Sequence, residues 1–447
     1  MISAARAALV TLALIAAPAA SFAADVPAFP GAEGFGARAT GGRGKPVYEV
    51  TNLNDSGPGS LRDAVSEGNR TIIFRVSGTI ELEKRLTVSK PNITLAGQTA
   101  PGDGICLRGK ELFIVDTDNV IVRFLRLRPG DERKEEHDAL SIRNSGNVII
   151  DHCSLSWSTD SLNDVTHASG NVTVQWCILS EPLDNSVHVK GAHGYGTGWD
   201  GRIKGGGSFH HNLIAHCHSR APRIGYYKEG RGLIDCRNNV IYNSGPSYGG
   251  ETDDLNFVAN YYRPGPQDLR RKGELFAIWS DDARMHVAGN LYEGEPAVAA
   301  DNAAAVTFNA GRTAGGEAKR GDAATCLVGK PFDCPAVITD PAEQAYRRVL
   351  DDAGATLPRR DVVDARVLAD VRNRTGRVIN SQSAVGGWPK LNSAPPPRDA
   401  DRDGMPDDWE RARGLDPSNS QDGPTLTADG YTNLEHYLNH LATPPGR

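Results

Sequence analysis

Three aspartates precede a repeated asparagine at similar distances, and they are the first candidates for chemistry in this chain. Asp138 lies nine residues before Asn147, and Asp160 and Asp164 lie eleven and seven residues before Asn171. If the repeats stack, residues at similar offsets stand side by side, so we expect the three carboxylates to converge on one face. Carboxylates that lie so close repel one another unless a cation binds among them, and oxygen ligands favour a hard ion such as Ca²⁺. The alternative is three unrelated surface aspartates.

A group of cationic residues follows the aspartates along the chain. Arg220 and Arg223 bracket a proline at the end of a strand repeat, and a pair of guanidinium groups suits a substrate that carries carboxylates. Lys190 would add a third positive charge, and we expect His188, in the same segment, to contact the substrate as well. A calcium site beside such a cluster would bind a polyanion such as an acidic polysaccharide. The alternatives are a surface ion pair for the arginines and a solvated loop for Lys190.

The elements that must position these residues repeat along the chain. Asn92, Asn119, Asn147 and Asn171 each follow a turn and open a run of alternating apolar residues, at spacings of 27, 28 and 24 residues. This period is typical of a stacked solenoid. Because the repeats are strand-like and lack a crossover helix, we predict an all-β parallel β-helix. Looser copies continue to Tyr292, and their asparagines are expected to form an internal ladder of amides: Asn212, Asn239, Asn260 and Asn290.

We divide the chain into four parts. Residues 1–24 have the charged start, apolar core and small-residue cleavage site of a secretory signal, which predicts an extracellular or periplasmic protein without a membrane span. Residues 25–294 are the β-helix, opened by a glycine-rich cap over 28–50 and by a short helix with Ser60 as its N-cap. Residues 295–394 form a return segment on the outside of the solenoid with one helix at Ala342–Asp352, and residues 395–447 form a linker and tail. The formal charge of −6 makes nucleic acid an unfavourable partner, and we expect a monomer.

The seven cysteines allow disulfides in an exported protein, and their odd number leaves at least one without a partner in the chain. Cys326 and Cys334 flank a short loop and are the best candidate pair. Cys153 and Cys177 occupy the same place in consecutive repeats, about 4.8 Å apart, so they form either a disulfide or two buried thiols.

The tail contains a calcium-loop pattern. Acidic residues fall at loop positions 1, 3, 5, 9 and 12 of the stretch from Asp399 to Glu410, with Gly404 at position 6. The predicted ligands are Asp399, Asp401, Asp403, Met405 (through its carbonyl), Asp407 and Glu410. A second stretch from Thr425 to His436 keeps only part of the pattern, so we expect one calcium loop and one degraded copy. The alternative is an acidic, solvated tail.

The chain resembles the pectate lyases of polysaccharide lyase family 1 over roughly residues 28–292. The motifs that carry the resemblance are Phe29–Gly36, Asp138–Ile142, Ile150–Ser154, Asp160–Val165, His210–Asn212 and Arg220–Arg223. The resemblance implies a right-handed β-helix and calcium-dependent β-elimination on polygalacturonate, with Asp138, Asp160 and Asp164 as calcium ligands and Arg220 as the base. The chain departs from the family at Gly225, where members often have a further Arg, and Arg223 would take over that contact. The tail, which resembles bacterial dockerin-like calcium repeats, lies outside the core family domain and suggests attachment to a cell surface or enzyme complex.

The chemistry of these residue types agrees with elimination. Calcium would stabilise the charge that develops on the uronate carboxylate when the C5 proton leaves. A bound cation and Arg223 would disfavour the protonated form of Arg220, whose ordinary pKa lies above ~12. Two alternatives remain, namely a polygalacturonase-type hydrolase on the same fold, suggested by His193-Gly194 and Arg202–Lys204, and a non-catalytic polysaccharide-binding β-solenoid.

Overall fold

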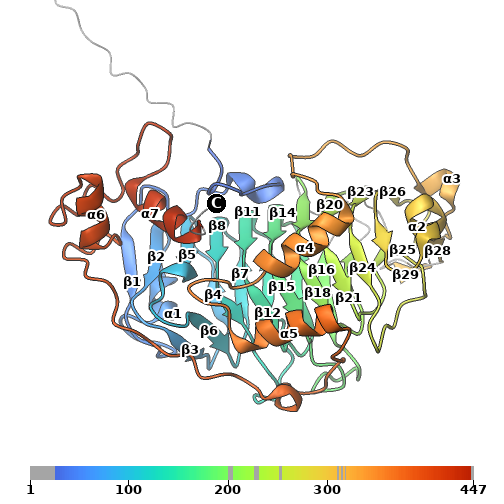
Figure 1. The fold of residues 1–447 in the computed structure, drawn as a ribbon, viewed down its shortest axis with the longest axis horizontal. Helices are drawn as coiled ribbons and strands as arrows, with labels where there is room; N and C mark the ends of the chain where they lie inside the picture. The colour runs from blue at the N-terminus through green and yellow to red at the C-terminus, as the bar shows by residue number, and fades with distance from the viewer. Residues whose placement is uncertain are drawn as a thin grey trace, which may run out of the picture.

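The strands of this protein wind into a parallel β-helix, as the repeats predict (Figure 1). The computed structural model describes residues 26–199, 205–225, 231–250, 254–309, 312–313, 316–317 and 319–443. The expected secretory signal, residues 1–24, lies outside this range. No helix of the described part is long and apolar enough to cross a membrane.

Each coil contributes one strand to each of three parallel sheets. The first sheet has the order β1 (Val47–Val50), β2 (Arg70–Phe74), β5 (Ile93–Ala96), β8 (Asp118–Arg123), β11 (Gly146–Asp151), β14 (Gly170–Gln175), β17 (Gly207–His210), β20 (Leu233–Arg237), β23 (Asp254–Val258) and β26 (Arg284–Ala288). The second contains β3 (Gly78–Glu81), β6 (Ile105–Arg108), β9 (Arg126–Leu127), β12 (Ser154–Ser156), β15 (Ile178–Ser180), β18 (Leu213–Ala215), β21 (Val240–Tyr242), β24 (Tyr261–Arg263) and β27 (Leu291–Tyr292). The third contains β4 (Leu86–Val88), β7 (Leu112–Val115), β10 (Leu140–Arg143), β13 (Ser161–Thr166), β16 (Tyr195–Trp199), β19 (Arg223–Ile224), β22 (Tyr248–Gly249), β25 (Phe276–Ile278) and β28 (Val306–Phe308). A small hairpin joins β29 (Arg312–Thr313) to β30 (Gly316–Glu317).

The register of the first sheet follows the repeated asparagines. Val148 pairs with Val120 on one side and with Val172 on the other, so the four predicted repeats stack in step. Asn147 has a positive φ of 48°, which asparagine tolerates better than most residues, and its amide donates to Asp118 on the preceding coil. The alternating residues between these turns point inward and form the main core.

The predicted internal amide ladder is confirmed. The side chains of Asn212, Asn239, Asn260 and Asn290 are buried and hydrogen-bond from coil to coil, and Asn302 extends the ladder. Each amide also donates to a main-chain carbonyl, for example Asn239 to Phe209, so the buried polar groups are satisfied along the stack.

Two cysteines, both free thiols, precede the asparagines in the same stack. The main-chain N–H of Cys153 contacts the Cys177 sulfur at 3.4 Å, and the N–H of Cys177 donates to Asn212. All seven cysteines lie in the described part of the chain and are free, so the expected Cys326–Cys334 disulfide is wrong for this structure. Cys326 is instead buried in the core, where its thiol contacts the Ser280 carbonyl.

The glycine-rich N-terminal segment covers a side of the solenoid, whereas the sequence suggested a cap. The Gly36 N–H donates to Thr173 on β14, and the Phe35 N–H donates to Ser208 on β17. A Cβ at Gly36 would lie 2.3 Å from the Val148 carbonyl oxygen, so this close approach requires glycine. The open end is covered by α1 (Leu61–Ala64), which Ser60 caps as predicted and whose Leu61 enters the core.

The return segment packs on the second sheet (Figure 1). The predicted helix is α4 (Ala342–Asp352), and an unpredicted α5 (Val362–Asn373) follows it. Short helices α2 (Pro296–Ala300) and α3 (Ala323–Cys326) pack at the far end of the core. The solenoid itself continues past the expected boundary at residue 294, because β28 pairs with β25.

Buried ion pairs join the return segment to the coils. Arg128, the residue that follows β9, is fully buried and contacts Asp361 at 2.5 Å and Asp364 at 2.8 Å. Burial alone would raise the pKa of Asp361, but the charges of Arg128 and Arg126, with hydrogen bonds from Arg128 and the Asp364 N–H, together outweigh burial and hold that pKa below its usual range. The ion pair therefore stabilises the docked α5 at neutral pH.

The tail folds as two helices, α6 (Asp407–Arg413) and α7 (Asn433–Ala442), against the first coils. Figure 1 shows the return segment running back along the solenoid so that α6 and α7 lie beside β1, β2 and β5. The predicted helix near Leu434–His440 is confirmed as part of α7.

We predict that Asp361→Asn lowers the free energy of unfolding by about 3 kcal/mol at neutral pH, because Arg128 loses a buried charged partner while the amide can still cap α5. Since the folded-state pKa of Asp361 is depressed, its contribution should be lost as the pH falls below about 3.9, and the two proteins should then converge. Urea unfolding measures both effects. The exposed Asp351 of the Arg372 ion pair gives the control, since Asp351→Asn should change stability by less than about 1 kcal/mol. Equal effects of the two substitutions would contradict this account.

Candidate active site and metal centre

The candidate site residues lie on or just before consecutive strands of the third sheet. The register aligns Ser141 on β10 with Asp164 on β13, then with Gly198 on β16 and Arg223 on β19. Neighbouring strands lie about 4.8 Å apart, so this row crosses the sheet in short steps. The repeat spacing therefore brings the predicted acidic and basic residues to one face.

The three aspartates lie together at a cleft of about 270 Å³. Asp138 accepts from the Ser161 N–H of the next coil at 3.0 Å and from the Ser141 hydroxyl at 2.6 Å. One carboxylate oxygen of Asp160 and one of Asp164 are buried and have no hydrogen-bond partner among the described residues. Buried carboxylate oxygens without hydrogen-bond partners are what a hard cation requires, so the donor chemistry of the three aspartates fits a calcium ion. Among the described residues, the ligand atoms at this face that lie within 4.8 Å of one another are those of Asp160, His188 and His193.

The pKa values of these groups show how strongly the site disfavours uncompensated negative charge. Burial raises the pKa of Asp138 well above its ordinary value, and the charges of Asp164 and Asp160 raise it further. Burial also raises the pKa of Asp164 to about 6, with Arg220 opposing this rise and Asp160 adding to it. Both effects come from concentrating carboxylates in a partly desolvated place, which a bound cation would relieve.

Arg220 lies directly beside Asp164. Its Nη1 donates to the Ser161 hydroxyl at 2.9 Å and lies 3.4 Å from the Asp164 carboxylate. The guanidinium stacks over the Tyr195 ring at 4.2 Å, and the residue has a left-handed φ of 56°. Backbone in this region is uncommon for arginine and recurs at functional sites.

The pKa of Arg220 departs from the sequence-based expectation. Burial lowers it, but Asp164 and other neighbouring groups outweigh burial, and the pKa stands above its ordinary value. The expected lowering depends on a bound cation and on Arg223, and Arg223 is not among the main influences on this pKa.

Gly198 makes room for this arrangement. A Cβ at this position would lie 2.5 Å from an Asp164 carboxylate oxygen and 3.7 Å from the Arg220 Nη1. Because a real Cβ does not approach an oxygen so closely, any side chain here would displace Asp164.

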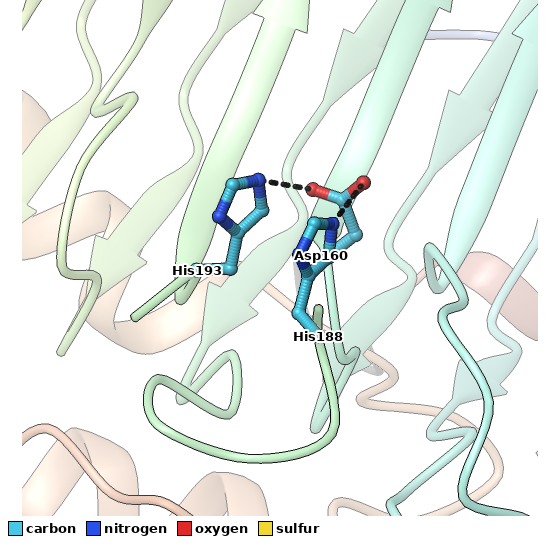
Figure 2. A group of neighbouring side chains, drawn as sticks. All are labelled: Asp160, His188 and His193. Atoms are coloured by element: carbon cyan, nitrogen blue, oxygen red, sulfur yellow. Dashed lines mark ion pairs between the residues drawn. The ribbon is translucent and has the colours of Figure 1, made fainter. Parts of the chain in front are cut away.

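Two histidines complete one side of the site (Figure 2). His188 and His193 are buried, and their Nε2 atoms lie 3.7 and 3.8 Å from the two oxygens of Asp160. The rings stack with centroids 3.6 Å apart and planes at 14°. An imidazole nitrogen binds a metal in the plane of its ring, so two nearly parallel rings cannot both bind one ion in this arrangement.

The other predicted substrate contacts lie farther out. Arg223 follows in the same row, with its guanidinium 5.5 Å from the Tyr248 ring and 5.8 Å from the Trp279 ring, and these rings stack on each other. Lys190 is exposed on the turn that follows His188.

Three residues of this site, Glu111, His137 and Tyr195, were not expected from the sequence, and His193 was named only as part of the hydrolase pattern. Glu111 and His137 line the same cleft, and burial raises the pKa of Glu111 and lowers that of His137 to about 4. Tyr195 begins β16 and pairs with Ser161, and His193 lies two residues before it; the irregular segment that precedes β16 obscures this register in the sequence. Arg202–Lys204, part of the hydrolase pattern, lie outside the described residues.

The tail brings together most of its predicted ligands and one more. Oxygens of Asp399, Asp401 and Asp403 lie within 4.8 Å of one another, and so do those of Asp403, Glu410 and Asp422. We call these five residues the tail cluster. Asp407 lies apart from it, since its carboxylate accepts from the Ala400 N–H and pairs with Arg398 and Arg411. The Met405 side chain is fully buried against Leu434.

Comparison with known proteins agrees with the family resemblance and with the fold. A family model described as pectate lyase matches residues 1–253. Proteins named probable pectate lyase C from Aspergillus flavus and Aspergillus fumigatus are each 36% identical, and the matches cover 94% and 93% of this chain and 95% and 93% of theirs. These matches extend into the tail, which the sequence analysis placed outside the core family domain.

Solved structures show the same fold at lower identity. The cedar-pollen allergen Jun a 1 superposes with a TM-score of 0.51 at 18% identity, over 72% of this chain and 92% of the allergen. A pectate lyase from Bacillus sp. N165 in complex with trigalacturonate gives a TM-score of 0.50 at 14% identity, over 72% of this chain and 98% of that one. The fold is thus the parallel β-helix that these proteins share. The chain belongs to the pectate lyase family.

Proposed function

We propose that this protein cleaves polygalacturonate by calcium-dependent β-elimination and releases unsaturated oligogalacturonides. Family membership supports the reaction class. The observation that carries the proposal is the placement of Arg220 3.4 Å from Asp164, beside carboxylate oxygens that lack partners in the described structure. A hard cation and a guanidinium on neighbouring coils would supply the two functions that the elimination needs, namely stabilisation of the developing negative charge and acceptance of the C5 proton.

Asp138, Asp160 and Asp164 are the proposed calcium ligands. When bound, calcium would neutralise these carboxylates and stabilise the negative charge that develops on the uronate carboxylate of the substrate. Asp138 is oriented by Ser141 and by the Ser161 N–H, so the protein fixes this ligand before substrate arrives. Glu111 adds negative charge at the cleft.

Arg220 is the proposed base. It accepts the C5 proton, the C5–H electron pair forms the C4–C5 double bond, and the bond from C4 to the glycosidic oxygen breaks, after which that oxygen takes up a proton. Because the charges of Asp164 and Asp160 contribute to the raised pKa of Arg220, their neutralisation lowers that pKa toward the range that a base requires. Tyr195 and Ser161 hold the guanidinium in place.

His188, Arg223 and Lys190 are proposed to contact the substrate. Arg223 lies one strand beyond Gly198 in the row that contains Asp164, so its fork can receive the carboxylate of an adjacent sugar. The Nε2 of His188 lies 3.6 Å from Glu136 and 3.7 Å from Asp160, so His188 adjoins one of the proposed calcium ligands. Lys190, on its exposed turn, would contact the polysaccharide from the solvent side.

We predict that the purified protein acts on polygalacturonate only when calcium is present, and that EDTA abolishes the reaction reversibly. The product should carry a C4–C5 double bond that absorbs ultraviolet light, because elimination creates an unsaturated uronate. Absorbance and reducing ends are measured together, with and without EDTA. New reducing ends without ultraviolet absorbance would show hydrolysis, and binding without cleavage would show a non-catalytic protein.

We predict that Arg220→Lys lowers kcat by about 10²–10⁴-fold with little change in KM, because the substitution keeps the charge but withdraws the base from C5. Arg284 pairs with Asp254 on the exposed edge of the first sheet, and Arg284→Lys is the matched control that should keep full turnover. Steady-state kinetics on polygalacturonate measures both variants. Full turnover by Arg220→Lys would require another base.

We also propose that the protein is secreted after removal of residues 1–24, because their pattern is that of a signal sequence. Expression of the full chain in a bacterial host should give an exported protein whose N-terminus is Asp25. Sequencing of its N-terminus tests this, and a retained Met1 on the exported protein would contradict it.

A further inference from the structure

The tail cluster is a second concentration of carboxylates, far along the chain from the aspartates of the third sheet. Asp399, Asp401, Asp403 and Glu410 come from the predicted loop, and Asp422 reaches the same place from the following turn. Asp403 belongs to both groups of oxygens within 4.8 Å, so it lies centrally. A Cβ at Gly423 would lie 2.5 Å from an Asp403 oxygen, which shows how closely the following turn approaches.

Buried oxygens without partners point to a ligand at this place. Glu410 is 0% exposed, and neither of its carboxylate oxygens has a hydrogen-bond partner in the part of the chain that the structure describes. Asp401, Asp403 and Asp422 each contribute one further buried oxygen in the same condition. A fully buried carboxylate with two unsatisfied oxygens is costly unless a cation binds to it.

The described cationic side chains compensate the charge of the tail cluster only in part. Arg75 approaches Asp399 at 3.9 Å, whereas the nearby Arg398 and Arg411 are paired with Asp407. Burial together with the neighbouring carboxylates raises the pKa of Asp403 to about 8 and that of Glu410 to about 7. The set of oxygen ligands, with waters and main-chain carbonyls, suits the six to eight oxygens that Ca²⁺ takes.

The tail cluster lies where the tail meets the first coils. Met405, two residues beyond Asp403, is buried with Leu434 and Leu438 against Ile73 on β2 and Ala96 on β5. Arg43 pairs with Glu435 on α7 at 2.8 Å. The same loop that supplies the carboxylates therefore supplies the apolar contact with the solenoid.

We propose that the tail cluster binds one calcium ion, and that this ion fastens the C-terminal tail over the first coils as a structural site separate from the catalytic one. Asp422 replaces Asp407 in the predicted set of ligands. The degraded second loop is closed by its own hydrogen bonds, from Thr427 to Asp429 and between Thr427 and His436, and supplies no ligand. The tail therefore packs against the β-helix of its own chain.

Hydrogen exchange on the full-length protein tests this site, first in chelator and then in calcium. Hydrogen exchange that requires opening of the tail is followed in peptides covering 399–422 and 70–74. In wild type, calcium at about 100 times its Kd should slow this exchange by about 100-fold. Asp408→Asn is the matched control, since the neighbouring Asp408 side chain is 99% exposed and outside the tail cluster. Asp164→Asn removes a ligand of the catalytic site, and both variants should respond as wild type does.

In the Glu410→Gln variant, calcium should no longer slow hydrogen exchange in the tail. The variant and wild type should therefore differ in opposite directions in chelator and in calcium. In chelator it should exchange more slowly than wild type, because an amide removes a buried, unpaired charge; in calcium it should exchange faster. If Glu410→Gln does not fold, Asp422→Asn gives the same comparison. Wild type without calcium protection in the tail, a Glu410→Gln protein that responds like wild type, or loss of the response in Asp164→Asn would overturn the proposal.

Discussion

The parallel, in-register pairing of consecutive coils is the constraint on which the rest of the structure depends. Main-chain hydrogen bonds hold Val120, Val148 and Val172 level with one another, and the same stacking holds Ser141, Asp164, Gly198 and Arg223 level on the third sheet. Residues that are 23 to 34 positions apart in sequence therefore stand about one strand spacing apart in space. The site has its geometry because the coils cannot slip without also breaking the buried Asn212–Asn302 ladder and the core beneath it.

That rigid frame allows the protein to keep carboxylates closer together than their charges favour. Asp138 and Asp164 at the catalytic face, and Asp403 and Glu410 in the tail, all have raised pKa values, with burial as the main cause. The two places differ in what lies beside them. Arg220 and the histidines adjoin Asp164 and Asp160, which suits the proposed site for an anionic sugar that must bind and leave. The tail cluster instead adjoins an apolar contact with β2 and β5, which suits a permanent ion.

Much of the fold could be predicted because its signal is local. The turn at Asn147 and the alternation of Val148 and Ile150 are visible in a few residues, and the repeat period then places Asp138, Asp160 and Asp164 on one face. Other features depend on contacts that the period does not contain. His193 and Tyr195 follow an irregular segment that interrupts the spacing of the repeats. Asp422 reaches the tail cluster through a turn outside the calcium-loop pattern. The N-terminal glycine-rich segment looked like an end cap, because only the tertiary structure shows Gly36 against Thr173.

The central claim is that one cation, held by aspartates of adjacent coils, and the guanidinium of Arg220 act on the same sugar. A crystal structure of the protein with Ca²⁺ and a bound oligogalacturonide tests it most directly. We predict an ion that contacts Asp138, Asp160, Asp164 and a uronate carboxylate, with the Arg220 guanidinium next to C5 of that sugar. An ion bound elsewhere, or an Arg220 directed away from C5, would contradict the account.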